Sequence, residues 1–276
     1  MFEKFSRSWA LVKASAAVLR SDKELMLFPV ISGAATLVVL ATFLLPMSLL
    51  GVFAEGWGAG AFVFGFLFYF CQYSVVIFFN SALVAAAMIR LDGGDPTLAD
   101  GFNAAKKRIP AILGYAAIAA TVGVLLQSLK NHRNNFIVRL IGSGLGAAWT
   151  LATFLVVPVL VSRDLGPIDA LKESVALLKR TWGENAIGNI GIGAAFGLIT
   201  FGTVLLGIGL TILAAQAWLG LAILVGGLFL IALLLLGVFQ AALSGVYSAV
   251  LYRYAVSHQT PEAFQGLQLD HAFDKR

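Results

Sequence analysis

Long apolar stretches alternate with short polar ones along the chain. The apolar stretches cover roughly residues 26–50, 61–90, 109–129, 136–162, 186–214 and 218–254. About 20 apolar residues cross a bilayer as a helix, and lipid offers no hydrogen-bond partner to an open strand edge. The pattern therefore predicts an all-α integral membrane protein with six transmembrane helices.

Short segments with an apolar stripe precede the first, third and fifth of these spans. Within 1–24, 96–110 and 166–184 apolar residues recur every three or four positions, which is one face of a helix. Thr97 with Asp100 resembles a capping box, and Gly166-Pro167 places proline at a first helical position. Basic residues gather toward the end of each segment. We therefore expect three cytoplasmic amphipathic helices that lie in the headgroup plane. The alternative is that the stripes pack against the ends of the bundle.

Together these elements predict a threefold repeat, in which an interfacial helix is followed by two spans. The units are 1–95, 96–165 and 166–260, with 261–276 as a cytoplasmic tail, in one transmembrane domain. The stretches SWALVK and SVALLK, at 8–13 and 174–179, agree at four of six positions. The competing explanation is that basic juxtamembrane helices arise from membrane orientation alone.

Basic residues are distributed unevenly between the two ends of the predicted spans. Of the 19 Lys and Arg residues, 16 fall on the side of both termini and only Lys130, Arg133 and Arg139 on the other. Basic residues near spans stay in the cytoplasm. We therefore predict that both the N- and the C-terminus are cytoplasmic.

Composition agrees with a membrane protein and yields little catalytic chemistry. Hydrophobic residues make up 59% of the chain and charged residues 12%, against about 25% in soluble domains, and the mean hydropathy is +0.90. The single cysteine, Cys71, excludes an internal disulfide. No common catalytic or nucleotide-binding motif is present, so we predict no enzymatic activity, no cofactor and no metal site. The stretch RLDGGDPT is interpreted as a turn before a helix rather than a cation site, since it lacks the further carboxylates of a calcium loop.

Several residue sets are candidates for contact with lipid. Basic residues near the interface can meet headgroups, and aromatic residues favour the interfacial belt. The predicted headgroup contacts are Lys4, Arg7, Lys13, Arg20, Lys23, Lys106, Lys107, Arg108, Lys179, Arg180 and Arg253. The predicted interfacial aromatic residues are Trp9, Trp182, Tyr252 and Tyr254.

Within the spans the informative residues are neutral and polar, or small. A polar pathway would run along Gln72, Asn80, Gln240 and Ser244, and interhelical hydrogen bonding is the alternative. Two GxxxG pairs, Gly142 with Gly146 and Gly193 with Gly197, predict close helix packing. Pro158 predicts a kink near the cytoplasmic end of the fourth span.

Four stretches together resemble a known family. They are SWALVKASAAVLRSDKELMLFPVISG, LDGGDPTLADGFNAAKKR, VVPVLVSRDLGPIDALKESVALLKRTWGE and AALSGVYSAVLYRYA. They resemble an uncharacterised family of prokaryotic polytopic membrane proteins, known only as a domain of unknown function. The pattern is also distantly similar to the membrane region of glycerophosphodiester phosphodiesterases. The resemblance implies a multi-pass protein of the cytoplasmic (inner) membrane. It supplies no substrate and no catalytic residue.

The sequence thus predicts a non-enzymatic membrane-organising or interaction protein. Its basic helices would engage membrane lipids, anionic ones preferred, or a protein partner, including a second copy of the chain. The alternative is a transporter or channel for a neutral or lipid-like solute. We expect no nucleic-acid partner.

Overall fold

The protein is described by a computed structural model covering residues 15–16, 18–49, 60–130 and 136–257. Every regular element within these ranges is a helix. They are η1 (Lys23–Met26), α2 (Leu27–Leu49), α3 (Gly60–Leu91), α4 (Leu98–Lys107), α5 (Ile109–Lys130), α6 (Phe136–Thr153), α7 (Val156–Ser162), α8 (Pro167–Ala217) and α9 (Leu219–Ser257). The all-α prediction is confirmed for this part of the chain.

Among the described residues, 6 helical segments are long and apolar enough to cross a membrane. They are Lys23–Pro46, Val63–Leu91, Ile109–Leu129, Gly142–Ser162, Gly193–Ala217 and Leu219–Arg253. Each lies within the stretch predicted from hydropathy, or exceeds it by a few residues. Their length and composition indicate a multi-pass membrane protein.

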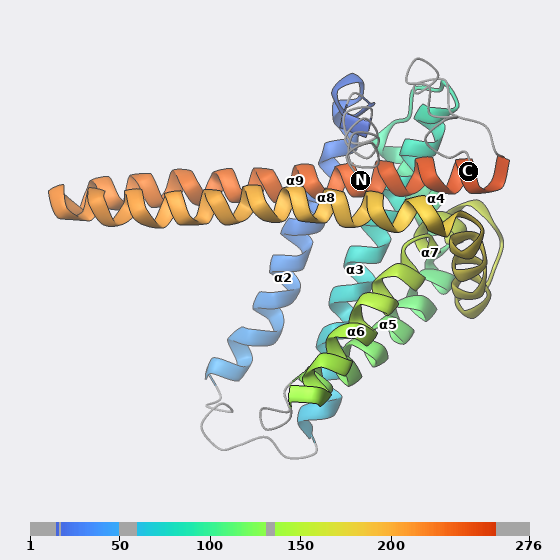
Figure 1. Cartoon of the computed structure of the whole chain (residues 1–276), viewed down its shortest axis with the longest axis horizontal. Coiled ribbons are helices and arrows are strands. Elements are labelled where there is room, and N and C mark those ends of the chain that lie inside the picture. Colours follow the sequence, from blue (N-terminus) through green and yellow to red (C-terminus); the bar gives the residue numbers. More distant parts are fainter. Residues whose placement is uncertain (1–14, 17, 50–59, 131–135, 258–276) are drawn as a thin grey trace.

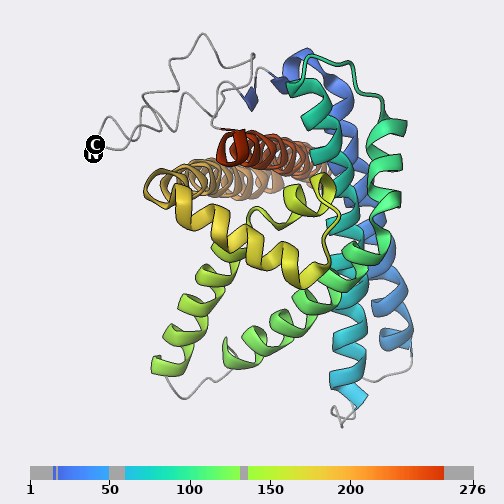
Figure 2. The same ribbon diagram turned by 90° about the vertical axis from the view of Figure 1, so that its right-hand side faces the viewer.

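The helices form two groups with different directions (Figure 1). Helices α2, α3, α5 and α6 run from the region of α4 and α7 toward one side of the molecule. Helices α8 and α9 form a long antiparallel hairpin that lies across them, and Figure 2 shows this hairpin end on. The six segments therefore do not share one direction in this arrangement.

The core lies where α4, α7 and the last turns of α9 meet α3, and the first turns of α8 pack on α7 at its edge. Helix α3 contacts α2, α4, α5, α7 and α9. The buried side chains are mostly small or β-branched, including Ala82, Val84, Ala86, Ala87, Val156, Val159, Val246 and Ala249. We call this part of the molecule the charged end, because the ion pairs described below border it.

Helix α4 begins with the predicted capping box. The Thr97 hydroxyl accepts a hydrogen bond from the backbone N–H of Asp100, and the Asp100 carboxylate accepts one from the N–H of Thr97. The apolar side of α4 packs on the bundle. The centroid of the Phe102 ring lies 5.3 Å from that of Phe28 and 5.8 Å from that of Phe79. Gly101 permits this approach, because a Cβ there would lie 2.7 Å from the Ala82 carbonyl oxygen. The apolar stripe of α4 therefore packs against the end of the bundle, which was the alternative to a helix with its stripe in lipid.

The segment 166–184 is not a separate helix. It forms the first turns of α8, which continues without interruption from Pro167 to Ala217. Gly166 and Pro167 begin the helix as predicted. The sequence of α8 then contains no further proline to end it. The first amphipathic segment lies largely outside the described residues.

Pro158 breaks the fourth span as predicted. Helix α6 ends at Thr153 and α7 starts at Val156. Proline has no N–H to donate to the carbonyl four residues earlier, here that of Phe154, and its ring clashes with that carbonyl. The freed N–H of Leu155 donates to the hydroxyl oxygen of Ser174 at 3.2 Å, and this hydroxyl donates to the Ala152 carbonyl at 2.7 Å. The Ser174 side chain of α8 therefore supplies a hydrogen-bond partner to two backbone groups at the break.

The two predicted glycine pairs have different surroundings. Gly142 is buried and Gly146 half-buried. Gly193 and Gly197 are exposed, and a Cβ built on either meets nothing within 4 Å. Among the described residues none lies against Gly193 or Gly197, so this part of the structure does not show the predicted close packing of the pair.

Candidate functional site: a neutral pocket among the spans

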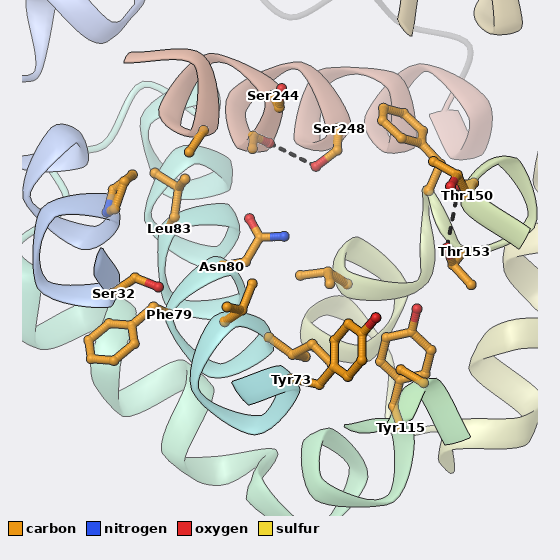
Figure 3. A pocket seen from close by; sticks show the side chains of 18 of the residues that line it. Ser32, Tyr73, Phe79, Asn80, Leu83, Tyr115, Thr150, Thr153, Ser244 and Ser248 are labelled. Carbon is orange, nitrogen blue, oxygen red and sulfur yellow. Dashed lines mark hydrogen bonds between the residues drawn. The ribbon is translucent and has the colours of Figure 1, made fainter. Parts of the chain in front are cut away.

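The charged end borders a pocket of about 510 Å³ that six helices line. Helix α3 supplies the largest share, and α2, α5, α6, α7 and α9 close around it (Figure 3). No Asp, Glu, Lys, Arg or His is among its lining residues. Its size falls within the range of small-molecule sites, which are mostly apolar with a few oriented polar groups.

Apart from the indole N–H of Trp149, the polar side-chain groups of the pocket are hydroxyls and one amide. They belong to Ser32, Tyr73, Asn80, Tyr115, Thr150, Thr153, Ser244 and Ser248. Thr150, Thr153 and Ser248 donate their protons to backbone carbonyls of their own helices, at 2.9, 2.9 and 2.8 Å. Their oxygens keep lone pairs that can accept a hydrogen bond from a ligand.

Asn80 supplies the one amide among the lining side chains. Its amide extends from α3 into the space between α3 and α9 (Figure 3). It makes no hydrogen bond to any residue that the structure describes. An amide without a partner in an apolar setting costs free energy. It can both donate to and accept from a bound molecule.

Gly245 brings α9 against this part of α3. A Cβ at this position would lie 2.4 Å from Cδ2 of Leu83 and 3.3 Å from Oδ1 of Asn80. A larger residue here would force the Leu83 side chain to shift and would crowd Asn80, which would change the pocket. The GxxxG pattern did not identify Gly245, although its position among Ala and Ser residues is typical of a helix contact.

The predicted polar pathway is brought together only in part. Asn80 and Ser244 line the pocket, whereas Gln72 and Gln240 do not. Gln72 instead donates to the backbone carbonyl of Thr36 on α2, at 3.4 Å. Sequence reasoning missed Tyr73 and Tyr115, because a tyrosine within an apolar run carries no signal of the direction of its hydroxyl.

The pocket is closed toward the charged end. Between the pocket and the charged end, the lining helices are packed together by buried side chains, including Val84, Ala87, Leu160, Val250 and Leu251. In the opposite direction the same helices are exposed at Leu45, Val63, Leu67 and Leu145. A molecule that enters the pocket from the opposite side or from the surrounding lipid therefore passes fewer tightly packed side chains.

Ion pairs tie the segments of the charged end together. Arg253 at the end of α9 pairs with Asp92, Arg90 with Asp95 at 3.3 Å, and Arg108 with Asp164. Asp92 and Asp95 belong to the turn after α3, where Gly93 adopts a φ of 81° that favours glycine. The interpretation of RLDGGDPT as a turn is therefore confirmed, and both of its carboxylates pair with arginine.

A fourth pair involves a tyrosine predicted to face the membrane interface. Arg163 pairs with Glu173 at 2.9 Å. A hydrogen bond with Tyr252, together with the charge of Glu173, raises the pKa of the Arg163 guanidinium. Tyr252 is only 5% exposed. Its assignment to the interfacial belt is therefore wrong within the chain, because its ring fills the core and its hydroxyl faces Arg163.

The predicted headgroup contacts also separate into groups. Arg20, Lys23, Lys106, Lys107 and Lys179 are exposed. Arg108 and Arg253 are half-buried and hold carboxylates of the chain. Lys4, Arg7, Lys13 and Trp9 lie outside the described residues, as do the side chains of Arg180, Trp182 and Tyr254. In the part that the structure describes, no three His, Cys, Asp or Glu residues are placed to hold a metal ion.

Comparison with known proteins identifies a family. The model of a family of unknown function, DUF6159, matches residues 59–262. The match covers well over half of the chain, so the chain belongs to this family. No curated protein and no solved structure matches. The prediction of an uncharacterised family is confirmed, and the distant similarity to the membrane region of glycerophosphodiester phosphodiesterases stays a prediction.

Proposed function

We propose that this member of DUF6159 binds a neutral, lipid-like molecule in the pocket between α3 and α9 and moves it without chemical conversion. The observation that carries the proposal is the Asn80 amide, which extends into a cavity of about 510 Å³ without a partner among the described residues. A hydroxyl or carbonyl of a ligand would satisfy this amide, and its hydrocarbon part would fill the apolar remainder.

The absence of charge in the lining favours a neutral ligand over an ion. A charged group inside the membrane region would need a partner of opposite charge, and no lining residue offers one. The packed residues at the charged end support entry from the lipid or from the opposite side. A diacylglycerol combines the required features, since it has one hydroxyl, ester carbonyls and acyl chains, and carries no charge.

The test uses a diacylglycerol with a photoreactive acyl chain, added to the full chain in lipid nanodiscs. We expect crosslinks to peptides that contain Tyr73 to Leu83 or Trp149 to Val157. Asn80→Leu keeps the side-chain size but removes the amide, and it should weaken binding roughly fivefold. Gln240→Leu is the matched control, because Gln240 lies on α9 outside the pocket.

Two outcomes would contradict this proposal. Crosslinks located outside the lining residues would show that the pocket is not the site. Equal binding by the wild type and by Asn80→Leu would show that the amide does not recognise the ligand. Transfer of a fluorescent diacylglycerol between the leaflets of reconstituted vesicles then distinguishes a transporter from a protein that only binds.

A second candidate function is engagement of anionic lipid by basic residues. It is favoured by Arg20, Lys23, Lys106 and Lys107, which are exposed near the charged end. Each cation near an anionic leaflet contributes about 1 kcal/mol of attraction. Retention of phosphatidylglycerol on the purified protein should then fall as salt rises, whereas retention of phosphatidylcholine should not.

A further inference from the structure

The polar side of α4 borders a groove of about 570 Å³, separate from the pocket described above. Asp100, Asn103, Ala104 and Lys107 face it with helical spacing, and Arg108 follows at the end of α4. Ile89 of α3 and Val161 of α7 form an apolar wall. The apolar side of α4, with Phe102, packs on the bundle, so the groove lies on the side that remains open.

The groove lies at the depth where lipid headgroups are expected. Ile89 is two residues before the end of the span Val63–Leu91, and Val161 is one residue before the end of Gly142–Ser162. Two spans thus end beside the groove on the same side of the molecule. The first carbons of a lipid could contact Ile89 and Val161 while its phosphate reaches α4.

The donors of the groove suit a phosphate group. Lys107 and Arg108 supply positive charge and Asn103 an amide. A guanidinium can bind two phosphate oxygens at once. The one carboxylate of the groove is that of Asp100. Its Oδ2 accepts hydrogen bonds from the hydroxyl and the backbone N–H of Thr97 at 2.7 and 3.0 Å, which lower its pKa. One of its two oxygens is thus held within the helix cap, and the charges of Lys107 and Arg108 outnumber its single negative charge.

Arg108 already has a partner, but one that can be replaced. Asp164 pairs with it while 95% of the Asp164 side chain is exposed. Exposed ion pairs contribute little to stability, since water competes for both charges. A phosphate held by Lys107 as well would therefore compete favourably for Arg108.

We propose that this groove binds the phosphate of an anionic phospholipid through Lys107, Arg108 and Asn103. The inference rests on the second candidate function and narrows it from a basic surface to one site. Lys106 is the natural control, because it carries the same charge on the same helix, is exposed, and does not line the groove.

The test measures binding of short-chain phosphatidylglycerol to the full chain in neutral detergent, by the shift in melting temperature and by native mass spectrometry. Lys107→Gln should weaken binding roughly five- to tenfold, whereas Lys106→Gln should change it less than twofold. Asp164→Asn frees Arg108 from its competing carboxylate and should strengthen binding. A purely structural role of the ion pair predicts the opposite for Asp164→Asn.

Other outcomes would separate the groove from a diffuse basic surface, and a phospholipid from free phosphate. Equal losses in Lys106→Gln and Lys107→Gln would overturn the groove but keep a diffuse basic surface. No preference for phosphatidylglycerol over phosphatidylcholine would overturn both. Inorganic phosphate, tested on the same variants, should stabilise the protein less than the lipid; equal stabilisation would refute the lipid as the source of the phosphate.

Discussion

Both halves of α9 are apolar enough to be free of charged residues up to Tyr252, but their surroundings are opposite. From Ala242 to Tyr252 every residue except Ser244 is buried. Closer to the hairpin tip, Leu219, Ile223, Leu230 and Leu234 are each more than 60% exposed. The buried half, 242–252, reads ALSGVYSAVLY, and the mostly exposed half, 219–236, reads LGLAILVGGLFLIALLLL. Apolarity alone therefore does not distinguish a helix face that meets protein from one that meets lipid.

The size of the side chains accounts for the difference. Small residues let helix backbones approach closely, and in a membrane this packing replaces the hydrophobic driving force. Leucine and isoleucine gain little by leaving lipid for protein. The same contrast recurs in α8, where Ala170 and Ser174 are buried while Leu198 and Leu206 are exposed. Small residues are not sufficient by themselves, however, because Gly193, Ala194 and Gly197 of α8 are exposed.

The largest effect is expected from a glycine in the packed half of α9. Gly245→Leu places side-chain atoms where Leu83 already lies 2.4 Å from the position of a Cβ. We expect about 2–3 kcal/mol of destabilisation, measured as a lower melting temperature in detergent. It should also weaken ligand binding, because the new side chain would crowd Leu83 and Asn80, which both line the pocket.

Gly197→Leu, in the exposed part of α8, is the matched control. Open space surrounds this glycine, so the free energy of unfolding should change by less than about 0.5 kcal/mol. An equally large effect would break the comparison, since it would mean that a second copy of the chain covers the hairpin.

A smaller effect is expected at the break between α6 and α7. Ser174→Ala removes the hydroxyl that satisfies Leu155 N–H and Ala152 C=O, which should cost about 1–2 kcal/mol. The control is Thr203→Ala in the hairpin, where the hydroxyl only donates to Ile199 C=O of its own helix. Thermal unfolding that ranks the two variants the other way would show that the break is satisfied by other means.

The smallest effect concerns pH and should be confined to the charged end. Residues 193–240 contain no Asp, Glu, Lys, Arg or His, so this part of the hairpin has no group that titrates near neutral pH. At the charged end Asp22 is buried, and its desolvation raises its pKa above 3.8 despite a backbone hydrogen bond from Glu24 and the charge of Arg90. Glu24 and Asp95 raise it further.

The direction in which pH changes the stability follows from proton binding. A raised pKa means that the folded protein binds this proton more readily than the unfolded chain, so its stabilising contribution is complete below pH 3.8 and is lost as pH rises through the raised value. Asp22→Asn should therefore melt higher than the wild type at neutral pH, and the difference should vanish in acid. A difference independent of pH would show that ionisation is not the cause.

The accuracy of the sequence predictions depended on how local the cause was. The break near Pro158, the start of α8 at Gly166-Pro167 and the Thr97–Asp100 cap were predicted correctly, because each follows from backbone chemistry within a few residues. The end of the third amphipathic segment was predicted wrongly, because α8 continues beyond residue 184 without interruption. The threefold repeat and the cytoplasmic orientation stay predictions.

Hydropathy by itself determined that the chain is helical, how many segments can cross a membrane, and roughly where each starts and ends, because a span must satisfy its own backbone hydrogen bonds in lipid. Only the tertiary structure decided which apolar faces meet each other. It joined Asn80 and Ser244 in one pocket and left Gln72 and Gln240 outside, buried Tyr252, and paired Arg108 and Arg253 with carboxylates. These outcomes depend on contacts between residues far apart in the chain, and residue type alone does not specify such contacts.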